Sequence, residues 1–422
     1  MDGSYWQRDA GWTERWGDHA VPHRVDFAVI GGGLAGLSTA IRLRERHRGA
    51  EIAVLEAERV GWGASGRNAG FLSPLAAPVW LMGAARHPDH AWASLRINDA
   101  VHQVAKWLST IGGDSEVTMA RYTMEGTGAL SDAGLREFAD ALDRIGLACA
   151  LRPSVVRPSH LALEMPGYLT HPYKLVLALA EHAIRSDVHI RERARVRAIE
   201  SVPAGAVVRI VDGSELFARR VVVCTNAYTS SLELGERVRA LVVYAYMMAS
   251  APLDLAQTAA LIRDGDFTLE LDFAQAFHRM HQHRMVFGGG DTVFAPSGGD
   301  HAVPSSVRTN LVDQLGRTFR HASAVGITDA WGGRFHVTST GLPIIRTSHR
   351  NPAVVLNVGY GGTGVALTLA CSRLAAAVAS DDTFERDEDA RLFAIIQATR
   401  PPLANGLRTI GRLAKQLVVP SR

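Results

Sequence analysis

One segment of the chain has the residue types and the spacing to bind a pyrophosphate: Gly31-Gly32-Gly33-Leu34-Ala35-Gly36. A short apolar run at residues 25–30 precedes it, and apolar residues at helical spacing follow over residues 34–48. Glycines at the first, third and sixth positions allow a tight turn, a close approach of the backbone to phosphates, and close packing of helix on strand. The N-terminus of the predicted helix would offer N–H groups and a positive dipole end to the ligand.

An acidic residue stands where a ribose would need it. Glu56 lies 20 residues past Gly36, at the end of a second predicted strand over residues 51–56, and would accept hydrogen bonds from a ribose diol. Strand, turn, helix and strand within about 30 residues are typical of a βαβ unit. These features predict a dinucleotide-binding site; the alternative is a glycine turn used only for packing.

A second glycine-rich segment, Gly61 to Gly70, indicates which dinucleotide is bound. It reads GWGASGRNAG and follows Glu56 closely. So many small residues allow the backbone to run against a flat ligand. A flavin is such a ligand, and the segment argues against the alternative of an NAD enzyme.

The chain resembles the FAD-dependent oxidoreductases of the D-amino-acid oxidase superfamily, and within it the gamma-glutamylputrescine oxidase-like branch. Four stretches carry the resemblance: Ala28–Gly36, Gly61–Gly70, Arg220–Thr229 and Trp331–Gly364. The N-terminal Ser4-Tyr5-Trp6 also fits that branch. The similarity extends over nearly the whole chain. It is specific for FAD and for the fold, and much less specific for the substrate.

The resemblance implies a set of FAD-binding residues. They are Gly31, Gly33, Leu34, Ala35, Gly36, Glu56, Ser65, Arg67, Asn68, Ala69, Gly70, Val196, Gly362, Thr363 and Gly364. Ser65 and Arg67 would face the phosphates, Asn68–Gly70 would lie along the isoalloxazine, and the backbone of Val196 would contact adenine. Thr363 would begin a second helix whose dipole stabilises negative charge on the reduced flavin. Arg67 could instead be a surface arginine, and Thr363 an N-cap, which is compatible with flavin contact.

The chain also departs from its superfamily. The positions that match the substrate-carboxylate arginine and lysine of sarcosine-oxidase-like members are Gly70 and Ala366, so we expect no sarcosine-type carboxylate site. Such members carry an oxygen-activating lysine on the strand that matches Arg284–Gly289, and this chain has none there. Arg284 or the neighbouring histidines could supply positive charge instead. The three lysines of the chain are Lys106, Lys174 and Lys415.

Covalent attachment of the flavin in relatives uses a cysteine or a histidine at known places. The segment Gly61–Gly70 contains neither residue type. His336 is the only histidine within residues 331–343, which contain no cysteine. We therefore expect FAD to be bound non-covalently.

Three histidines are close together in the run His-Arg-Met-His-Gln-His-Arg: His278, His281 and His283. On a strand, His281 and His283 would share one face and His278 would take the other. A zinc site is conceivable, but no carboxylate or cysteine stands at ligand spacing, so we expect no metal. The alternative is a set of exposed or lid-facing histidines.

Four residues are candidates to line the substrate cavity, although no catalytic residue can be assigned. The resemblance places the strand of Arg279 against that cavity, where the guanidinium could contact an anionic group. Tyr246 could line the cavity or be a packed tyrosine, and the role of Arg334, close after Trp331, is equally open. His171, before Pro172, is interpreted as the structural start of a helix.

Composition limits the class of protein to an ordinary globular one. The 422 residues include 47% apolar and 21% charged residues, with 45 Lys+Arg against 42 Asp+Glu, which excludes disordered and collagen-like chains. No Lys/Arg stripe predicts nucleic-acid binding. Cys149, Cys224 and Cys371 read as buried free thiols, which suits the cytoplasm. The N-terminus does not resemble a signal peptide, and we expect residues 365–379 to be too short and too polar to span a membrane.

These elements predict an α/β fold with two domains. A Rossmann-like FAD-binding domain of the glutathione-reductase type would comprise residues 24–85, 151–235 and 326–399. An α+β substrate domain with an antiparallel sheet would comprise residues 86–150 and 236–325. Residues 1–23 would form an N-terminal arm, and residues 400–422 a helical tail.

The function expected is oxidation of the C–N bond of an amine or amino acid by hydride transfer to flavin N5. The imine would hydrolyse to an aldehyde or keto acid, and oxygen or another acceptor would reoxidise the flavin. Arg279, Arg334 and the slightly basic chain hint at an acidic or zwitterionic substrate. One alternative is a dehydrogenase that passes electrons to a quinone or carrier protein; another is a flavoprotein subunit without turnover. The substrate, the stereochemistry and the oligomeric state stay open.

Overall fold

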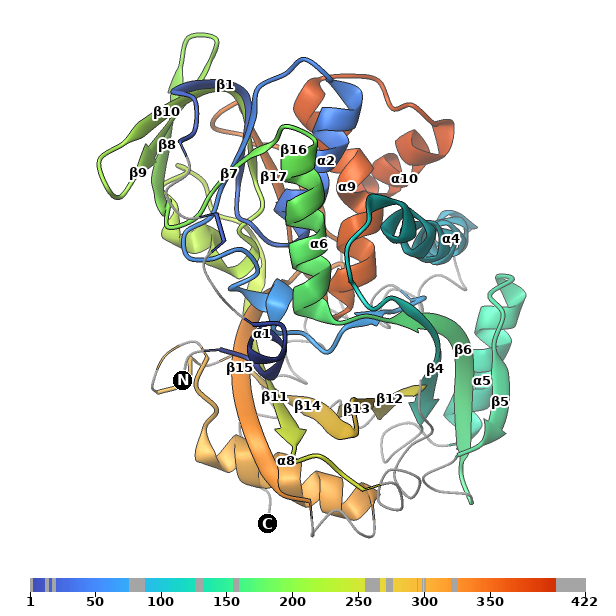
Figure 1. The fold of residues 1–422 in the computed structure, drawn as a ribbon. Helices are drawn as coiled ribbons and strands as arrows, with labels where there is room; N and C mark the ends of the chain where they lie inside the picture. Colours follow the sequence, from blue (N-terminus) through green and yellow to red (C-terminus); the bar gives the residue numbers. More distant parts are fainter. Residues whose placement is uncertain are drawn as a thin grey trace.

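The computed structural model describes residues 3–11, 15–16, 20–75, 88–125, 132–154, 159–254, 266–270, 276–293, 295–297, 299, 301–319 and 325–399. Two sheets occupy separate parts of the molecule, one above the other in Figure 1. The predicted tail over residues 400–422 lies outside the described residues.

The first sheet has eight strands. They are β1 (Arg24–Ile30), β2 (Ile52–Leu55), β7 (His189–Arg191), β8 (Val196–Val202), β9 (Gly205–Ile210), β10 (Glu215–Val223), β16 (Ile344–Thr347) and β17 (Val354–Val358). The order is β16-β17-β10-β1-β2-β7, with the β8–β9 hairpin joined to β10. The five strands from β17 to β7 in this order are parallel. β2 and β17 are buried at every position, as strands of a parallel sheet covered on both faces should be.

Three helices cover one face of this sheet: α2 (Leu34–Arg46), α6 (Pro172–Arg185) and α9 (Gly364–Ser380). Their apolar side chains share one core with Phe27 and Val29 of β1. The neighbouring residues on β1, Ala28 and Ile30, point to the other face, where they pack with the β8–β9 hairpin. This arrangement brings the N-termini of α2 and α9 to the carboxyl ends of their preceding strands.

The second sheet has nine strands. They are β3 (Phe71–Leu72), β4 (Thr118–Glu125), β5 (Ala150–Pro153), β6 (Leu161–Leu169), β11 (Leu241–Ser250), β12 (Asp266–Glu270), β13 (Phe277–His281), β14 (Arg284–Thr292) and β15 (Ile327–Val337). The order is β15-β11-β14-β13-β12-β4-β6-β3, with β5 on β6, and only β12 and β4 pair in parallel among these described strands. Helix α8 (Ser305–Thr318) packs on one face. On the other face, Met247, Val286 and Trp331 join the core of the first sheet. The predicted fold class is confirmed.

The sheets cross the predicted domain ranges. Strands β5, β6 and β15 belong to the second sheet, although the ranges 151–235 and 326–399 included most of them in the FAD-binding domain. Helix α4 (Pro88–Ile111) packs on α9 and α10 (Asp387–Ala398), whereas α5 (Asp132–Arg144) packs on β5 and β6. A linear apolar pattern does not show which distant strand a segment pairs with. The division into domains therefore remains a prediction.

Helix α9 and the turn before it form an unusually apolar segment. Within the described residues, Gly361–Ser380 is the one helical stretch long and apolar enough to cross a membrane, and 67% of its most apolar window is buried inside the protein. The expectation that residues 365–379 are too short and too polar to span is therefore wrong by length and composition. A buried core helix of a globular protein passes the same test.

Candidate functional site

The turn between β1 and α2 has the geometry of a phosphate cradle. Gly31 adopts a φ of +110°, which only glycine tolerates easily, and its N–H donates to the carbonyl of Leu55 (2.8 Å). A Cβ on Gly36 would lie 1.9 Å from the carbonyl oxygen of Gly31, so turn and helix touch through their backbones. Gly33 is the N-cap of α2 and has no side chain of its own to cap the helix, which leaves the N-terminus suited to an anionic ligand.

Glu56 reaches back to this turn from the end of β2. Its carboxylate accepts hydrogen bonds from the N–H groups of Gly32 (2.6 Å) and Glu58 (3.0 Å). Burial raises the pKa of Glu56, and these two bonds oppose the shift. Each carboxylate oxygen can accept a further hydrogen bond, so the group can still bind a diol. Val196 begins β8 close by, because Ala194 donates to the carbonyl of Glu56 (2.8 Å).

The second glycine-rich segment packs directly on the first. The N–H of Gly61 donates to the carbonyl of Gly32 (3.1 Å), and the N–H of Leu34 donates to the Ser65 hydroxyl (3.0 Å). Ser65 lies in the short 3₁₀ helix η1 (Ala64–Gly66). A Cβ on Gly33 would be 2.7 Å from the Ser65 oxygen, so the close approach requires glycine. Ser65 therefore stands at the N-terminus of α2, beside the phosphate cradle.

The end of this segment is tied to the second sheet. Arg67 is buried with 3% of its surface exposed, so the surface-arginine alternative does not hold. Its Nε donates to the Trp62 carbonyl (2.7 Å), and its own carbonyl accepts from Trp331 Nε1 (2.8 Å). The Asn68 oxygen accepts from the N–H of Gly70 (2.8 Å), which closes the turn. The loop is thus fixed between both sheets.

The N-terminus of α9 offers a second polar position. Thr363 closes the 3₁₀ turn η4 (Gly361–Thr363) and is the N-cap of α9, yet its side chain makes no capping bond. Its hydroxyl oxygen is buried and, within the described residues, has no hydrogen-bond partner. A Cβ on Gly362 would meet nothing within 4 Å, so open space lies beside it, whereas Gly364 contacts Tyr360. A bound ligand with a polar edge would satisfy this hydroxyl.

The four substrate-cavity candidates go to different places. Tyr246 is fully buried on the face of the second sheet that packs on α8, and its hydroxyl contacts Thr292 (3.1 Å). Trp331 lies on the opposite face. The guanidinium carbon of Arg334 lies 4.0 Å from the centroid of the Tyr228 ring. Tyr228 belongs to the 3₁₀ helix η2 (Asn226–Ser231). Strand alternation predicted two faces without showing which one meets the segment Gly61–Gly70, called the cofactor loop below.

Arg279 holds the backbone of the cofactor loop. Its Nη1 donates to the carbonyls of Ala69 (3.1 Å) and Thr170 (2.8 Å), and the side chain is buried. A Cβ on Gly70 would clash with this guanidinium and with the Thr170 carbonyl. The arginine therefore supports the loop whether or not it also contacts an anionic substrate.

The histidine run does not form one strand. β13 ends at His281, and His283 lies in the hairpin turn with a φ of +60°, so the two do not share a strand face. His278 packs against the ring of Phe319 on the side of α8. The run therefore separates into three different environments because a turn falls inside it.

Sequence reasoning missed the contacts of the N-terminal helix α1 (Tyr5–Asp9). The Ser4 hydroxyl donates to the carbonyl of Gly66 (2.9 Å), and Gln7 Nε2 donates to the carbonyl of Gly61 (3.1 Å). Trp6 is fully buried nearby. The capping box of Ser4 and Gln7 was the available sequence signal, and it fixes the same two side chains that reach the loop.

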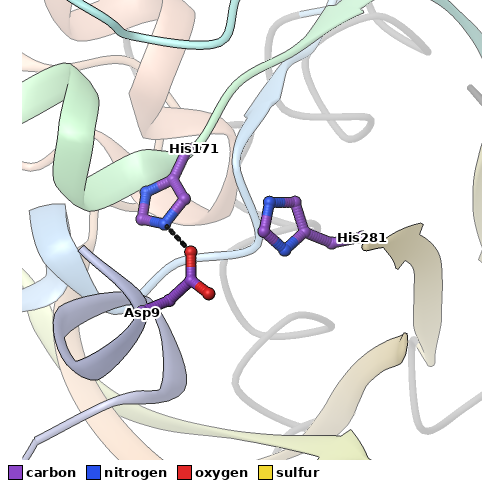
Figure 2. A group of neighbouring side chains, drawn as sticks. All are labelled: Asp9, His171 and His281. Carbon is purple, nitrogen blue, oxygen red and sulfur yellow. Dashed lines mark hydrogen bonds and ion pairs between the residues drawn. The ribbon is translucent and has the colours of Figure 1, made fainter. Parts of the chain in front are cut away.

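Figure 2 shows a cluster of Asp9, His171 and His281, whose possible ligand atoms lie within 4.8 Å of one another. His171 Nδ1 accepts the N–H of Lys174 at the start of α6 (3.1 Å), so its proton is on Nε2, which donates to Asp9 (3.2 Å). His281 contacts Tyr5 through Nδ1 and Glu116 through Nε2. A metal at His171 Nε2 would need the proton on Nδ1 and would break the helix cap. The cluster is thus a hydrogen-bonded docking site for α1.

Comparison with known proteins identifies the family. The family model described as FAD dependent oxidoreductase (DAO) matches residues 26–378, so the chain belongs to this family. FAD is therefore its cofactor, as predicted. Thr363 and the cradle around Gly36 fit such a group: they offer an unsatisfied buried hydroxyl and a turn that no Cβ could enter.

Relatives cover nearly the whole chain. The probable oxidoreductase OrdL of Rhizobium meliloti (strain 1021) is 24% identical over 90% of this chain and 92% of its own length. The gamma-glutamylputrescine oxidoreductase of Escherichia coli (strain K12) is 27% identical over 87% of this chain and 86% of its own length. The crystal structure of glycine oxidase from Geobacillus kaustophilus aligns with a TM-score of 0.72 at 19% identity over 86% of this chain and 97% of that one, which shows a shared fold. The resemblance inferred from the sequence is confirmed.

Proposed function

We propose that the protein oxidises the C–N bond of an amine or amino acid. One observation carries the proposal: the segment Arg67–Gly70 is bonded to the second sheet through Trp331 and Arg279. A ligand along that segment would face a sheet that can hold a small molecule beside it. The relatives named for glycine and for gamma-glutamylputrescine support an amine as that molecule.

The residues of this chain would bind, orient and shield. When bound, FAD supplies a hydride acceptor. The cradle around Gly36 and Ser65 would hold the phosphates, and Glu56 the ribose. The N-terminus of α9 at Thr363 would favour negative charge at the pyrimidine end. Trp331, which is buried, would exclude water from the loop that carries the ring. We propose that the flavin stays free of a covalent bond and that the enzyme is cytoplasmic, as its free cysteines suggest.

A second candidate, a dehydrogenase that passes electrons to a quinone or carrier protein, is favoured by the positions of the cationic side chains. Arg284 Nη1 donates to the carbonyl of Ser250 (2.7 Å), and His281 is held by Tyr5 and Glu116. Lys174 pairs with Glu116 and with Asp114 (2.9 Å). These groups are thus already engaged in hydrogen bonds and ion pairs within the protein, which weakens their case as oxygen activators.

The test is anaerobic mixing of the purified holoenzyme with a panel of amines and amino acids. Bleaching of the flavin band by one compound would support the proposal and name its substrate class. Admission of air would then separate the two candidates, because an oxidase recolours quickly and a dehydrogenase slowly. A yellow protein that no amine bleaches would favour the alternative of a non-catalytic flavoprotein subunit.

A further inference from the structure

One carboxyl group near the end of β14 has no partner. Asp291 makes no hydrogen bond or ion pair within the described residues, and its side chain is only partly exposed. Burial raises the pKa of Asp291 to about 7. A half-buried carboxylate without a cation beside it is uncommon, because burial disfavours the charged form unless a partner compensates.

The residues on either side of Asp291 show which way it faces. A Cβ on Gly290 would lie 3.2 Å from Val307 of α8, and the hydroxyl of Thr292 contacts Tyr246, which also packs toward α8. Side chains alternate between the two faces of a strand. Asp291 therefore belongs to the face opposite α8. A register shift between Tyr244 and Tyr246 marks the bulge that places it there.

That face meets the cofactor loop. The residue of β11 opposite the bulge is Ala245, which pairs with Gly333 of β15. A Cβ on Gly333 would be 3.8 Å from the side chain of Arg67, and Trp331 on the same strand donates to the Arg67 carbonyl. Asp291 is two strands from Gly333, about 10 Å across the sheet. It thus lies on the sheet face where the proposed substrate would sit.

Within the described residues, no neighbouring cation accounts for the carboxyl. The charged and titratable side chains on the elements around it include Tyr244, Tyr246, Arg334, His336, His301, Arg67 and Arg308. In the described part of the chain, none of them forms an ion pair or hydrogen bond with Asp291. Burial raises the pKa of Tyr246, and the charge of Asp291 helps to raise it. Arg334 lies over Tyr228, and His301 contacts the carbonyl of Gly332 (3.0 Å). Among the described residues none supplies a cation to this carboxyl, and a bound cationic ligand would supply one.

We propose that Asp291 binds the ammonium group of a cationic amine substrate and accepts its proton. In this step one N–H bond of the ammonium breaks and one O–H bond forms on the carboxylate, with no change in oxidation state. The product is the neutral amine, whose free electron pair hydride loss requires. The inference rests on the proposed function and narrows its substrate class to amines that arrive protonated.

The test compares the holoenzyme with Asp291→Asn, which keeps the shape and removes the charge. Putrescine, gamma-glutamylputrescine and glycine serve as probes, and anaerobic flavin reduction is followed from pH 5.5 to 9. The wild-type rate should fall about tenfold per pH unit below pH 7. Asp291→Asn should not show this fall in rate below pH 7, and it should react about 10²–10⁴-fold more slowly than the wild type. Asp291→Glu should keep the fall in rate below pH 7. Asp313→Asn is the control: Asp313 lies in α8, on the opposite side of the sheet, and this variant should behave as wild type.

A second measurement does not depend on turnover. Perturbation of the flavin spectrum by putrescine gives its dissociation constant, which Asp291→Asn should raise at least about tenfold. Weaker binding in the variant with no reduction in either protein would refute the proposed function and leave the ammonium site standing. Equal binding, or reduction with an unchanged pH profile in Asp291→Asn, would overturn the inference and leave the proposed function intact. If Asp291→Asn fails to fold, Asp291→Ser replaces it in both assays.

Discussion

Replacing Gly36 with alanine should weaken FAD binding, although alanine is the better helix former. The new Cβ would lie 1.9 Å from the carbonyl oxygen of Gly31 and 3.3 Å from a methyl group of Val29. An ordinary contact needs about 3.5 Å, so turn and helix must separate by ~1.5 Å. The obstacle is a backbone atom of the phosphate cradle, which cannot swing aside as a flexible side chain would.

Two opposing effects set the size of the result. Alanine in a helix interior gains about 1 kcal/mol over glycine. Overpacking costs about 1–3 kcal/mol and more where backbone must move, so the clash in Gly36→Ala exceeds the gain. A net loss of about 2 kcal/mol in the cradle corresponds to FAD binding weakened ~30-fold.

Titration of apoprotein with FAD, followed by quenching of flavin fluorescence, gives the dissociation constant, and a thermal melt gives the stability. Gly49→Ala is the matched control, because a Cβ there would meet nothing within 4 Å. It should leave both quantities near wild type. Wild-type FAD affinity in Gly36→Ala would refute the reasoning, because the cradle would then not depend on this backbone contact.

Three further predictions concern the site and its support. Thr363→Val should stabilise the apoprotein by about 1–2 kcal/mol in a thermal melt, since it removes a buried unpaired hydroxyl, and yet weaken FAD binding in a titration. Ser4→Ala with Gln7→Ala should raise the FAD dissociation constant about tenfold or more, because two bonds to the cofactor loop are lost; an unchanged constant would contradict the supporting role of α1. Burial lowers the pKa of His171 to about 4, so the unfolded chain binds more protons than the folded one between pH 4 and 6.5. The free energy of unfolding, measured by urea denaturation, should therefore fall by ~3 kcal/mol as the pH drops through that range. His171→Asn, which can still cap α6, should make this fall smaller.

The sequence predicted the cofactor half of the fold well because its signals are local. The turn at Gly31–Gly36 and Glu56 lie within one βαβ unit, so their spacing along the chain already determines their proximity. The second sheet was harder, since its strands pair across long stretches of sequence. The alternation around Tyr246 predicted a strand correctly, but only packing on α8 shows which face it takes.

Two polar residues have surroundings that their place in the sequence did not show. The resemblance placed the strand of Arg279 against the substrate cavity, and a substrate contact stays a prediction, but its guanidinium also holds backbone carbonyls. Its partners are carbonyls of Ala69 and Thr170, more than one hundred residues earlier. The prediction that His281 and His283 share a strand face is wrong because a turn separates them, and nothing in their spacing marks it. The turn has positive φ angles at Gln282 and His283.

The docking of α1 has a consequence for how the protein is made. Its partners His171 and His281 follow it by more than 160 and 270 residues, and a ribosome adds about 5–20 residues per second. The helix therefore waits roughly 15–55 s after its own synthesis before His281 exists. The loop at Gly61–Gly66 is complete long before this support arrives. A nascent chain shorter than about 280 residues can make the bonds of α1 to Gly61, Gly66 and His171 but lacks the contact of Tyr5 with His281, so the support of the cofactor site is completed late in translation.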